Sequence, residues 1–182
     1  MSATHYAAKY IAFLGVLVSA AVSGSCTDPV IDDAIEKLGD EPGSPGEGPE
    51  HRPGQPCALC HRDGGPASSH FAVAGTVFDG QDPTSKGVEG VEVLFVDAAG
   101  HFPSAAGQKK PIFTNKSGNF YVLAEDWPDL QFPFHVRLVK AGKVVSMQSH
   151  VGREPSCSGC HRDADKNVSN DKFGALGRVY FR

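Results

Sequence analysis

The sequence predicts a mainly β protein built around a single β-sandwich. Gly and Pro are abundant, with 21 and 13 residues among 182, and this composition is typical of chains with many turns. From Phe71 onward, short runs rich in Val, Phe and Ile follow a two-residue period, as expected for strands with one buried face. Turn-forming residues separate these runs at short intervals, which favours a sandwich over a helical bundle.

The predicted strands fill most of residues 71–149, and one more lies near the C-terminus. They are Phe71–Phe78, Val91–Val96, Pro111–Thr114, Asn119–Leu123, Phe134–Lys140, Lys143–Met147 and Leu176–Phe181. Along the fifth strand, alternation places Phe134, Val136 and Leu138 on one face. The step at Ala141 and Gly142 predicts a hairpin between the fifth and sixth strands.

Residues 1–25 are predicted to be a signal peptide. Lys9 precedes an apolar stretch, Tyr10–Val22, that is too short to span a membrane comfortably but suits secretion. The alternative is a genuine anchor helix. The small residues at 23–25, followed by Cys26, resemble a bacterial lipobox, although Ser occupies a position where that pattern prefers an aliphatic residue. The resemblance implies that Cys26 is lipidated and becomes the first residue, with simple cleavage elsewhere as the alternative.

Residues 26–56 carry this N-terminus, a short helix and a tether. A helix is predicted over Asp28–Gly39, where apolar residues recur at helical spacing after Asp28 and a proline. The Pro- and Gly-rich stretch Asp40–Pro49 is polar and cannot build a core. It would let the following domain, residues 57–182, stand away from a membrane.

Two pentapeptides carry the chemistry of the chain. The sequence Cys-Ala-Leu-Cys-His begins at Cys57, and Cys-Ser-Gly-Cys-His begins at Cys157. Two thiols one short turn apart can form thioethers to haem vinyl groups, and the adjacent histidine can reach the iron. The chain is therefore predicted to bind two haem c groups. The predicted attachment and ligand residues are Cys57, Cys60, His61, Cys157, Cys160 and His161.

Paired cysteines have two other common uses besides haem attachment. A zinc ribbon also uses two Cys-x-x-Cys pairs, but its pairs lie closer together and zinc does not explain the adjacent histidines. Disulfides, including a thioredoxin-like redox pair, are the other alternative, but the βαβ context of that pair is missing. The cysteine count supports the lipid anchor, because two haems would use four of the five cysteines and a lipid at Cys26 would account for the fifth.

Each haem iron needs a second axial ligand or leaves that position open. His70 lies between the first motif and the first strand, and His150 lies between the sixth strand and the second motif. These matching positions predict His70 and His150 as the second ligands, with Met147 as the alternative to His150. Which histidine serves which haem stays open. A crossed arrangement is possible if the two haem loops meet at one end of the sandwich.

Other polar residues have less specific interpretations. His51 in the tether and His101 in a Gly-rich loop are expected at the surface. His135 either faces solvent or packs on a haem edge. Arg62 and Arg162 directly follow the motif histidines, where each is either a partner for haem propionates or a solvated charge.

The strand region resembles a known sandwich type. Residues 75–79, 87–93 and 114–120 are similar to the carboxypeptidase regulatory-like, prealbumin-type β-sandwich. In this interpretation Gly118 permits the turn and Phe120 points into the core. The resemblance implies a passive scaffold without catalytic activity. It gives a haem loop at 57–70, the sandwich at 71–149, and a second haem loop with the last strand at 150–182, so that a haem-binding segment stands at each end.

The two motifs resemble those of multihaem cytochromes c, in the pentapeptides alone. The resemblance implies an exported electron-transfer protein, not an enzyme, whose partners are redox proteins such as other cytochromes. With Cys26 it implies a lipid-anchored protein facing the periplasm or the cell surface, with the outer membrane favoured. The net charge is -4 and no long basic block occurs, which argues against nucleic-acid binding.

Two other functions stay open at this stage. A small peroxidase-like haem enzyme would need one iron with an open position and a polar distal pocket. A surface binding or assembly module would use the sandwich edges for strand addition, as a homo-oligomer whose stacked haems could conduct electrons.

Overall fold

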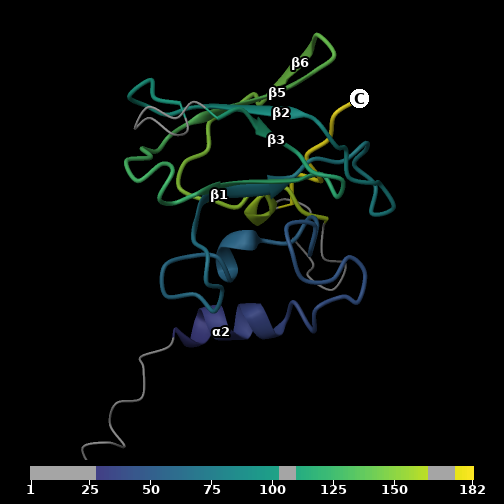
Figure 1. Cartoon of the computed structure of the whole chain (residues 1–182), viewed down its shortest axis with the longest axis vertical. Helices are drawn as coiled ribbons and strands as arrows, with labels where there is room; N and C mark the ends of the chain where they lie inside the picture. The colour runs from purple at the N-terminus through teal and green to yellow at the C-terminus, as the bar shows by residue number, and fades with distance from the viewer. Residues whose placement is uncertain (1–27, 103–109, 164–174) are drawn as a thin grey trace, which may run out of the picture. The chain divides into compact units, whose positions relative to one another are not determined.

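The computed structural model describes residues 28–102, 110–163 and 175–182. Within these ranges the chain is mainly β, with two antiparallel sheets packed together, one short helix and two 3-10 turns (Figure 1). The predicted signal peptide and Cys26 lie outside the described residues. Among the helices that are described, none has the length and apolar character needed to cross a membrane.

Helix α2 spans Pro29–Glu36 and confirms the short helix predicted there. Asp28 caps it, because the Val30 amide donates to Asp28 Oδ1 at 3.0 Å, and proline is favoured in the first turn. The chain divides into two units, residues 1–34 and 35–182. All strands belong to the second unit.

Six strands form the two sheets. Their bounds are β1 Phe71–Thr76, β2 Glu92–Val96, β3 Ile112–Phe113, β4 Asn119–Leu123, β5 His135–Lys140 and β6 Lys143–Ser146. One sheet pairs β1 with β4, and the other has the order β3-β2-β5-β6. Each observed strand lies within a predicted one. The predicted seventh strand, residues 176–181, is wrong in extent: it pairs only through a bridge between Phe78 and Tyr180, beyond the end of β1.

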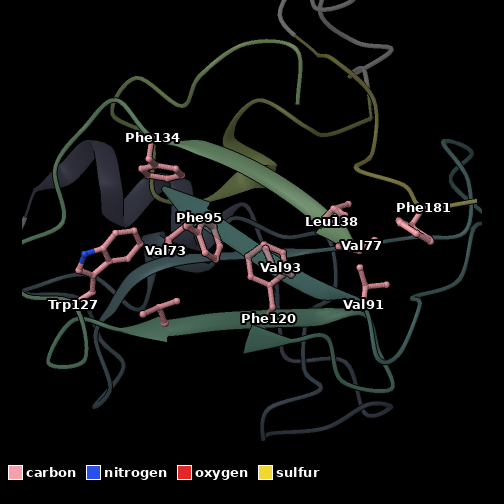
Figure 2. Packing of buried hydrophobic residues seen from close by; sticks show 11 residues of the cluster. Val73, Val77, Val91, Val93, Phe95, Phe120, Trp127, Phe134, Leu138 and Phe181 are labelled. Carbon is pink, nitrogen blue, oxygen red and sulfur yellow. The ribbon is translucent and has the colours of Figure 1, made fainter. Parts of the chain in front are cut away.

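The hydrophobic core lies between the two sheets. Its buried side chains are Val73, Val77, Val91, Val93, Phe95, Phe120, Val122, Trp127, Phe134, Leu138 and Phe181. Phe95 of β2 and Phe120 of β4 approach each other across the layers, with ring centroids 5.9 Å apart (Figure 2). Phe95 also meets Trp127 and Phe134 edge-on. Burying one such side chain contributes about 1.5–3 kcal/mol, so this aromatic group holds the sheets together.

The hairpin β5–β6 follows the predicted alternation. Leu138 is buried while His135 and Arg137 are exposed. Ala141 and Gly142 connect the strands with φ values of 49° and 80°. Positive φ at both central residues is the conformation of the two-residue turns that match strand twist.

The turn before β4 explains the Asn-Lys-Ser-Gly sequence. Asn115 Oδ1 accepts hydrogen bonds from the Ser117 and Asn119 amides, both at 3.0 Å. Gly118 has a φ of 77°, and a Cβ there would collide with the Val77 carbonyl oxygen. Only glycine fits this position without strain, as the sequence predicted.

Strand β1 departs from simple alternation. Every residue from Val73 to Thr76 is buried. A strand with one solvent face would alternate, so both faces of β1 must be covered. The core covers one face, and the turns that carry the two Cys-x-x-Cys-His motifs contact this strand as well. Strand β1 is therefore the support on which the candidate site is built.

Candidate cofactor site

Each motif forms one 3-10 turn, η1 over Cys57–Leu59 and η2 over Cys157–Gly159. In each turn the histidine amide donates to the carbonyl of the first cysteine, at 2.9 Å for His61 and 2.7 Å for His161. Side chains three residues apart lie over one another in a 3-10 turn. The turn therefore brings the two thiols of each motif to the same side, with the histidine next to them.

Both motif histidines present the same ring nitrogen to the protein. His61 Nδ1 lies 2.9 Å from the Ser69 carbonyl oxygen and 3.1 Å from Ser69 Oγ. His161 Nδ1 lies 3.2 Å from the Gly177 carbonyl oxygen. A carbonyl oxygen accepts only, so these contacts assign the proton to Nδ1 and leave the lone pair on Nε2. Neutral imidazole with a free Nε2 is a ligating form of histidine.

The surroundings of His61 also favour its neutral form. Burial is the main cause that lowers its pKa below the ordinary histidine value, and the hydrogen bond to the Ser69 carbonyl opposes this in part. The neighbouring His51 and His70 lower the pKa further. At neutral pH the ring is therefore uncharged, as a metal ligand requires.

All four motif cysteines lie within the described residues and are free thiols. Burial raises the pKa of Cys57 to about 11 and that of Cys157 to about 12, so both are protonated at neutral pH. Across the described ranges, no group of three or more His, Cys, Asp or Glu side chains is arranged to hold a metal ion.

The two turns bind each other. The Ala58 amide in the first turn donates to Ser156 Oγ, just before the second turn, at 2.7 Å. In return, Ser158 Oγ donates to the Gln55 carbonyl at 2.7 Å. Both serines are buried. The two motif segments flank the sandwich in the sequence, but in the fold they do not lie at opposite ends of it, because they meet beside β1.

The second turn also docks directly on β1. The Ala74 amide donates to the Pro155 carbonyl at 2.9 Å, and Ala74 pairs with Ser156 in a parallel bridge. Next to it, a Cβ on Gly75 would lie 2.8 Å from both Cβ and Sγ of Cys157. The missing side chain of Gly75 is therefore what lets Cys157 pack against the strand.

A buried polar pair anchors the segment before the first turn. Thr76 Oγ1 donates to Asn119 Oδ1 at 2.7 Å across β1 and β4. Asn119 Nδ2 then donates to the His51 carbonyl at 2.9 Å and the Pro49 carbonyl at 3.3 Å. The Gly54 amide donates to Thr76 Oγ1 at 2.8 Å. The end of the predicted tether region is thus held against the strands.

A cavity of about 780 Å³ lies beside the second motif. Cys157, Cys160 and His161 line it, together with the apolar face of β5. The predicted second ligand His150 and its alternative Met147 line it as well. Met147 is half-buried and His150 is exposed. Cofactor sites commonly occupy about 300–1,000 Å³ with mostly apolar walls. The size and lining of this cavity therefore fit a bound haem.

Aromatic rings surround the first motif histidine. The His61 ring stacks on Phe71, with centroids 4.0 Å apart and planes 6° from parallel. The His51 ring lies 5.7 Å from the His61 ring at 18°. The predicted ligand His70 has a side chain 41% exposed, and its Nδ1 lies 4.0 Å from Asp63 Oδ1. The sequence predicts His51 at the surface, but the residue is half-buried. The neighbouring residues in the sequence give no indication of the distant Asn119, which binds the His51 carbonyl.

The remaining predicted residues take different positions. Arg62 Nε is buried and finds no hydrogen-bond partner among the described residues, so this cation next to His61 fits an anionic group such as a propionate. Arg162 Nη1 donates to the Asp163 carbonyl at 3.4 Å. His101 pairs with a nearby aspartate. The exposed His135 lies edge-on to His150, with centroids 6.2 Å apart.

Comparison with known proteins adds no family to these observations: no protein-family model matches the sequence, and neither curated proteins nor solved structures give a match. What the site can do follows from its residues. Each of the two turns has two thiols and an imidazole whose Nε2 has no hydrogen-bond partner among the described residues. These groups are the ones needed to hold two covalently attached haems.

Proposed function

We propose that this protein is an exported dihaem c-type cytochrome that transfers electrons between redox partners. The observation that carries the proposal is the pair of matched turns, in which each motif histidine binds a backbone carbonyl through Nδ1 and keeps Nε2 free. The thioether residues are Cys57, Cys60, Cys157 and Cys160, and the iron ligands from the motifs are His61 and His161.

The chain's own residues set the conditions for electron transfer. A bound haem supplies a reversible one-electron couple. The Ser69 and Gly177 carbonyls orient the two imidazoles and increase their basicity. The apolar face of β5 gives the cavity at the second motif one apolar wall. Arg62 Nε is buried without a hydrogen-bond partner among the described residues, so Arg62 would pair with a propionate.

A second axial residue closes each iron. At the second motif we favour His150, with Met147 as the alternative, because both line the cavity that also contains His161. At the first motif the sequence predicts His70. An iron with two protein ligands has no position for substrate and can only pass electrons, which favours a carrier over a peroxidase-like enzyme.

The sandwich serves as the scaffold of this cytochrome. The turn at Gly118 and the buried Phe120 agree with the prealbumin-type resemblance in the sequence. Strand β1 carries both motif turns, so the sandwich positions the two sites relative to each other.

The N-terminal pattern supports a lipid anchor at Cys26, on the outer membrane facing the periplasm or the cell surface. The redox partners are expected to be other proteins, such as cytochromes, and copies stacked on one another are a further arrangement. Mass spectrometry of the mature chain should find an acylated Cys26 as its first residue. A mature chain beginning elsewhere, with Cys26 unmodified, would exclude the anchor.

The haem content tests the proposal directly. After expression with a cytochrome c assembly system, the purified protein is denatured in alkaline pyridine and its optical spectrum is recorded. The unmodified chain should contain two covalent haems. The double variants Cys57→Ala/Cys60→Ala and Cys157→Ala/Cys160→Ala should each contain one, because each motif holds its own haem.

Two results would sink the proposal. One is an unmodified chain without covalent haem, and zinc bound in stoichiometric amount would then favour the ribbon alternative. The other is a double variant that still carries two haems. Rapid binding of carbon monoxide by the reduced, unmodified protein would instead show an open iron and favour the haem-enzyme alternative.

A further inference from the structure

His51 is held in place by the sandwich and not by its own segment alone. Its amide donates to the Gly48 carbonyl at 3.1 Å, and its carbonyl accepts from Asn119 Nδ2 at 2.9 Å. Asn119 is itself buried in β4 and bonded to Thr76 of β1. The backbone of His51 is therefore fixed relative to the strand that supports both motif turns.

The ring of His51 lies close to that of His61. The centroids are 5.7 Å apart. Iron–imidazole bonds resemble zinc–imidazole bonds of about 2 Å, so two imidazoles on opposite sides of one iron have centroids roughly 6 Å apart. Among the described residues, no hydrogen bond engages the ring nitrogens of His51. The ring is half-buried and its plane lies 18° from that of His61, in a stacked arrangement. The distance therefore suits two ligands of one iron, and a rotation of the His51 side chain would aim a nitrogen at that iron.

His70, the ligand predicted from sequence, starts from the wrong side of the His61 ring. Its neighbour Ser69 binds Nδ1 of His61, and Nδ1 is on the side of the ring away from Nε2. The next residue, Phe71, stacks on the ring and donates its amide to the His61 carbonyl at 2.8 Å. Residues 69–71 thus contact the His61 ring at Nδ1 and on its face, and not at Nε2. To bind the iron on the side of the haem opposite His61, the His70 side chain would have to extend around the edge of the haem.

We infer that His51, rather than His70, is the second axial ligand of the first haem. This inference rests on the proposed function. Residues 51–61 would then hold the first haem from both sides. His51 supplies the second ligand at the start of this segment, and Cys57, Cys60 and His61 supply the thioethers and the first ligand at its end. Asn119 is then a positioning residue, because it holds the backbone of the second ligand without touching the haem.

The test compares His51→Ala with His70→Ala in the full chain carrying both haems. Carbon monoxide bound per chain is measured on the reduced protein, and the optical spectrum reports the spin state. His51→Ala should bind one more carbon monoxide per chain than the unmodified protein and should gain high-spin bands. His70→Ala, the matched control, should behave like the unmodified protein. His51→Gly should regain the low-spin spectrum when imidazole is added.

Two outcomes would overturn the inference. One is a gain of carbon monoxide binding by His70→Ala alone, and the other is a His51→Ala variant that binds no more carbon monoxide than the unmodified protein. If His51→Ala fails to accumulate, His51→Met keeps a ligand in place and should raise the potential of one haem; unchanged potentials count against His51. The haem count in pyridine tests the proposed function separately from the ligand assignment. Two covalent haems in every variant support the dihaem cytochrome, whether or not His51 is the second ligand.

Discussion

The two motif histidines differ in how strongly the protein holds their Nδ1–H groups. His61 has two acceptors, the carbonyl and the hydroxyl oxygen of Ser69, at 2.9 and 3.1 Å. His161 has one, the Gly177 carbonyl at 3.2 Å. A stronger acceptor makes an imidazole more basic and stabilises oxidised iron. At the scale of single residues, this difference favours a lower reduction potential at the first motif.

Replacing Ser69 with Ala removes the hydroxyl acceptor and keeps the carbonyl. The potential of the first haem should rise, because the ligand becomes less basic. One hydrogen bond contributes about 0.5–1.5 kcal/mol, and a one-electron potential changes by about 59 mV per factor of ten. The expected rise is therefore on the order of 20–60 mV in a spectroelectrochemical titration. Ser68→Ala, at an exposed neighbour, is the control and should leave both potentials unchanged. A fall in potential would contradict this role of Ser69.

At the scale of elements, the two 3-10 turns stabilise each other. Each turn leaves polar groups without partners inside it, and a serine of the second segment satisfies a group of the first. The buried Ser156 accepts from a backbone amide, whereas the buried Ser158 donates to a carbonyl. A buried amide without an acceptor is costly, and a carbonyl that loses one of its donors is less so.

Ser156→Ala should therefore destabilise the protein more than Ser158→Ala. Loss of the acceptor for the Ala58 amide should cost about 1–3 kcal/mol. Loss of the donor to the Gln55 carbonyl should cost about 0.5–1.5 kcal/mol. Denaturant unfolding of the two-haem protein measures both as shifts of the midpoint at constant slope. Equal midpoints for the two variants would show that the amide of the first turn finds another acceptor.

Local sequence patterns predicted the elements better than their contacts. The two-residue period in β5 sets which side chains are buried, so the burial of Leu138 and the exposure of Arg137 followed from sequence alone. The turn at Gly118 was also predictable, because its φ requirement is local. The C-terminal segment was not, because alternation suggested a strand and its pairing depends on the single partner Phe78.

The site could be predicted only in part. The cysteines and histidines of each pentapeptide are local, so the motifs were recognisable. Ala58 and Ser156 are 98 residues apart in the sequence, and no periodicity reports a contact between them. The position of His51 depends on Asn119, 68 residues away. The sequence around His51 is polar and contains no pattern that would predict its contact with Asn119.

At the scale of the whole molecule, the meeting of the two turns would make the two haems of the proposed cytochrome neighbours. Reducing one iron adds a negative charge near the other and makes the second reduction harder. Two charges roughly 10–15 Å apart interact by about 1–1.7 kcal/mol at an effective dielectric constant of about 20. At about 59 mV per factor of ten, this corresponds to about 50–70 mV. The two haems should therefore not titrate independently.

The two double-cysteine variants provide the reference for this interaction. Each carries one haem and should titrate as a simple one-electron couple. The sum of their two curves describes haems that do not interact, and the unmodified protein should titrate over a wider range than this sum. High salt should reduce the excess width, because screening acts through solvent and Gly159 and Cys160 at the second turn are exposed. If the unmodified curve equals the sum, the two sites are too far apart or too well screened to interact. In that case the contact between Ala58 and Ser156 joins the segments without coupling their irons.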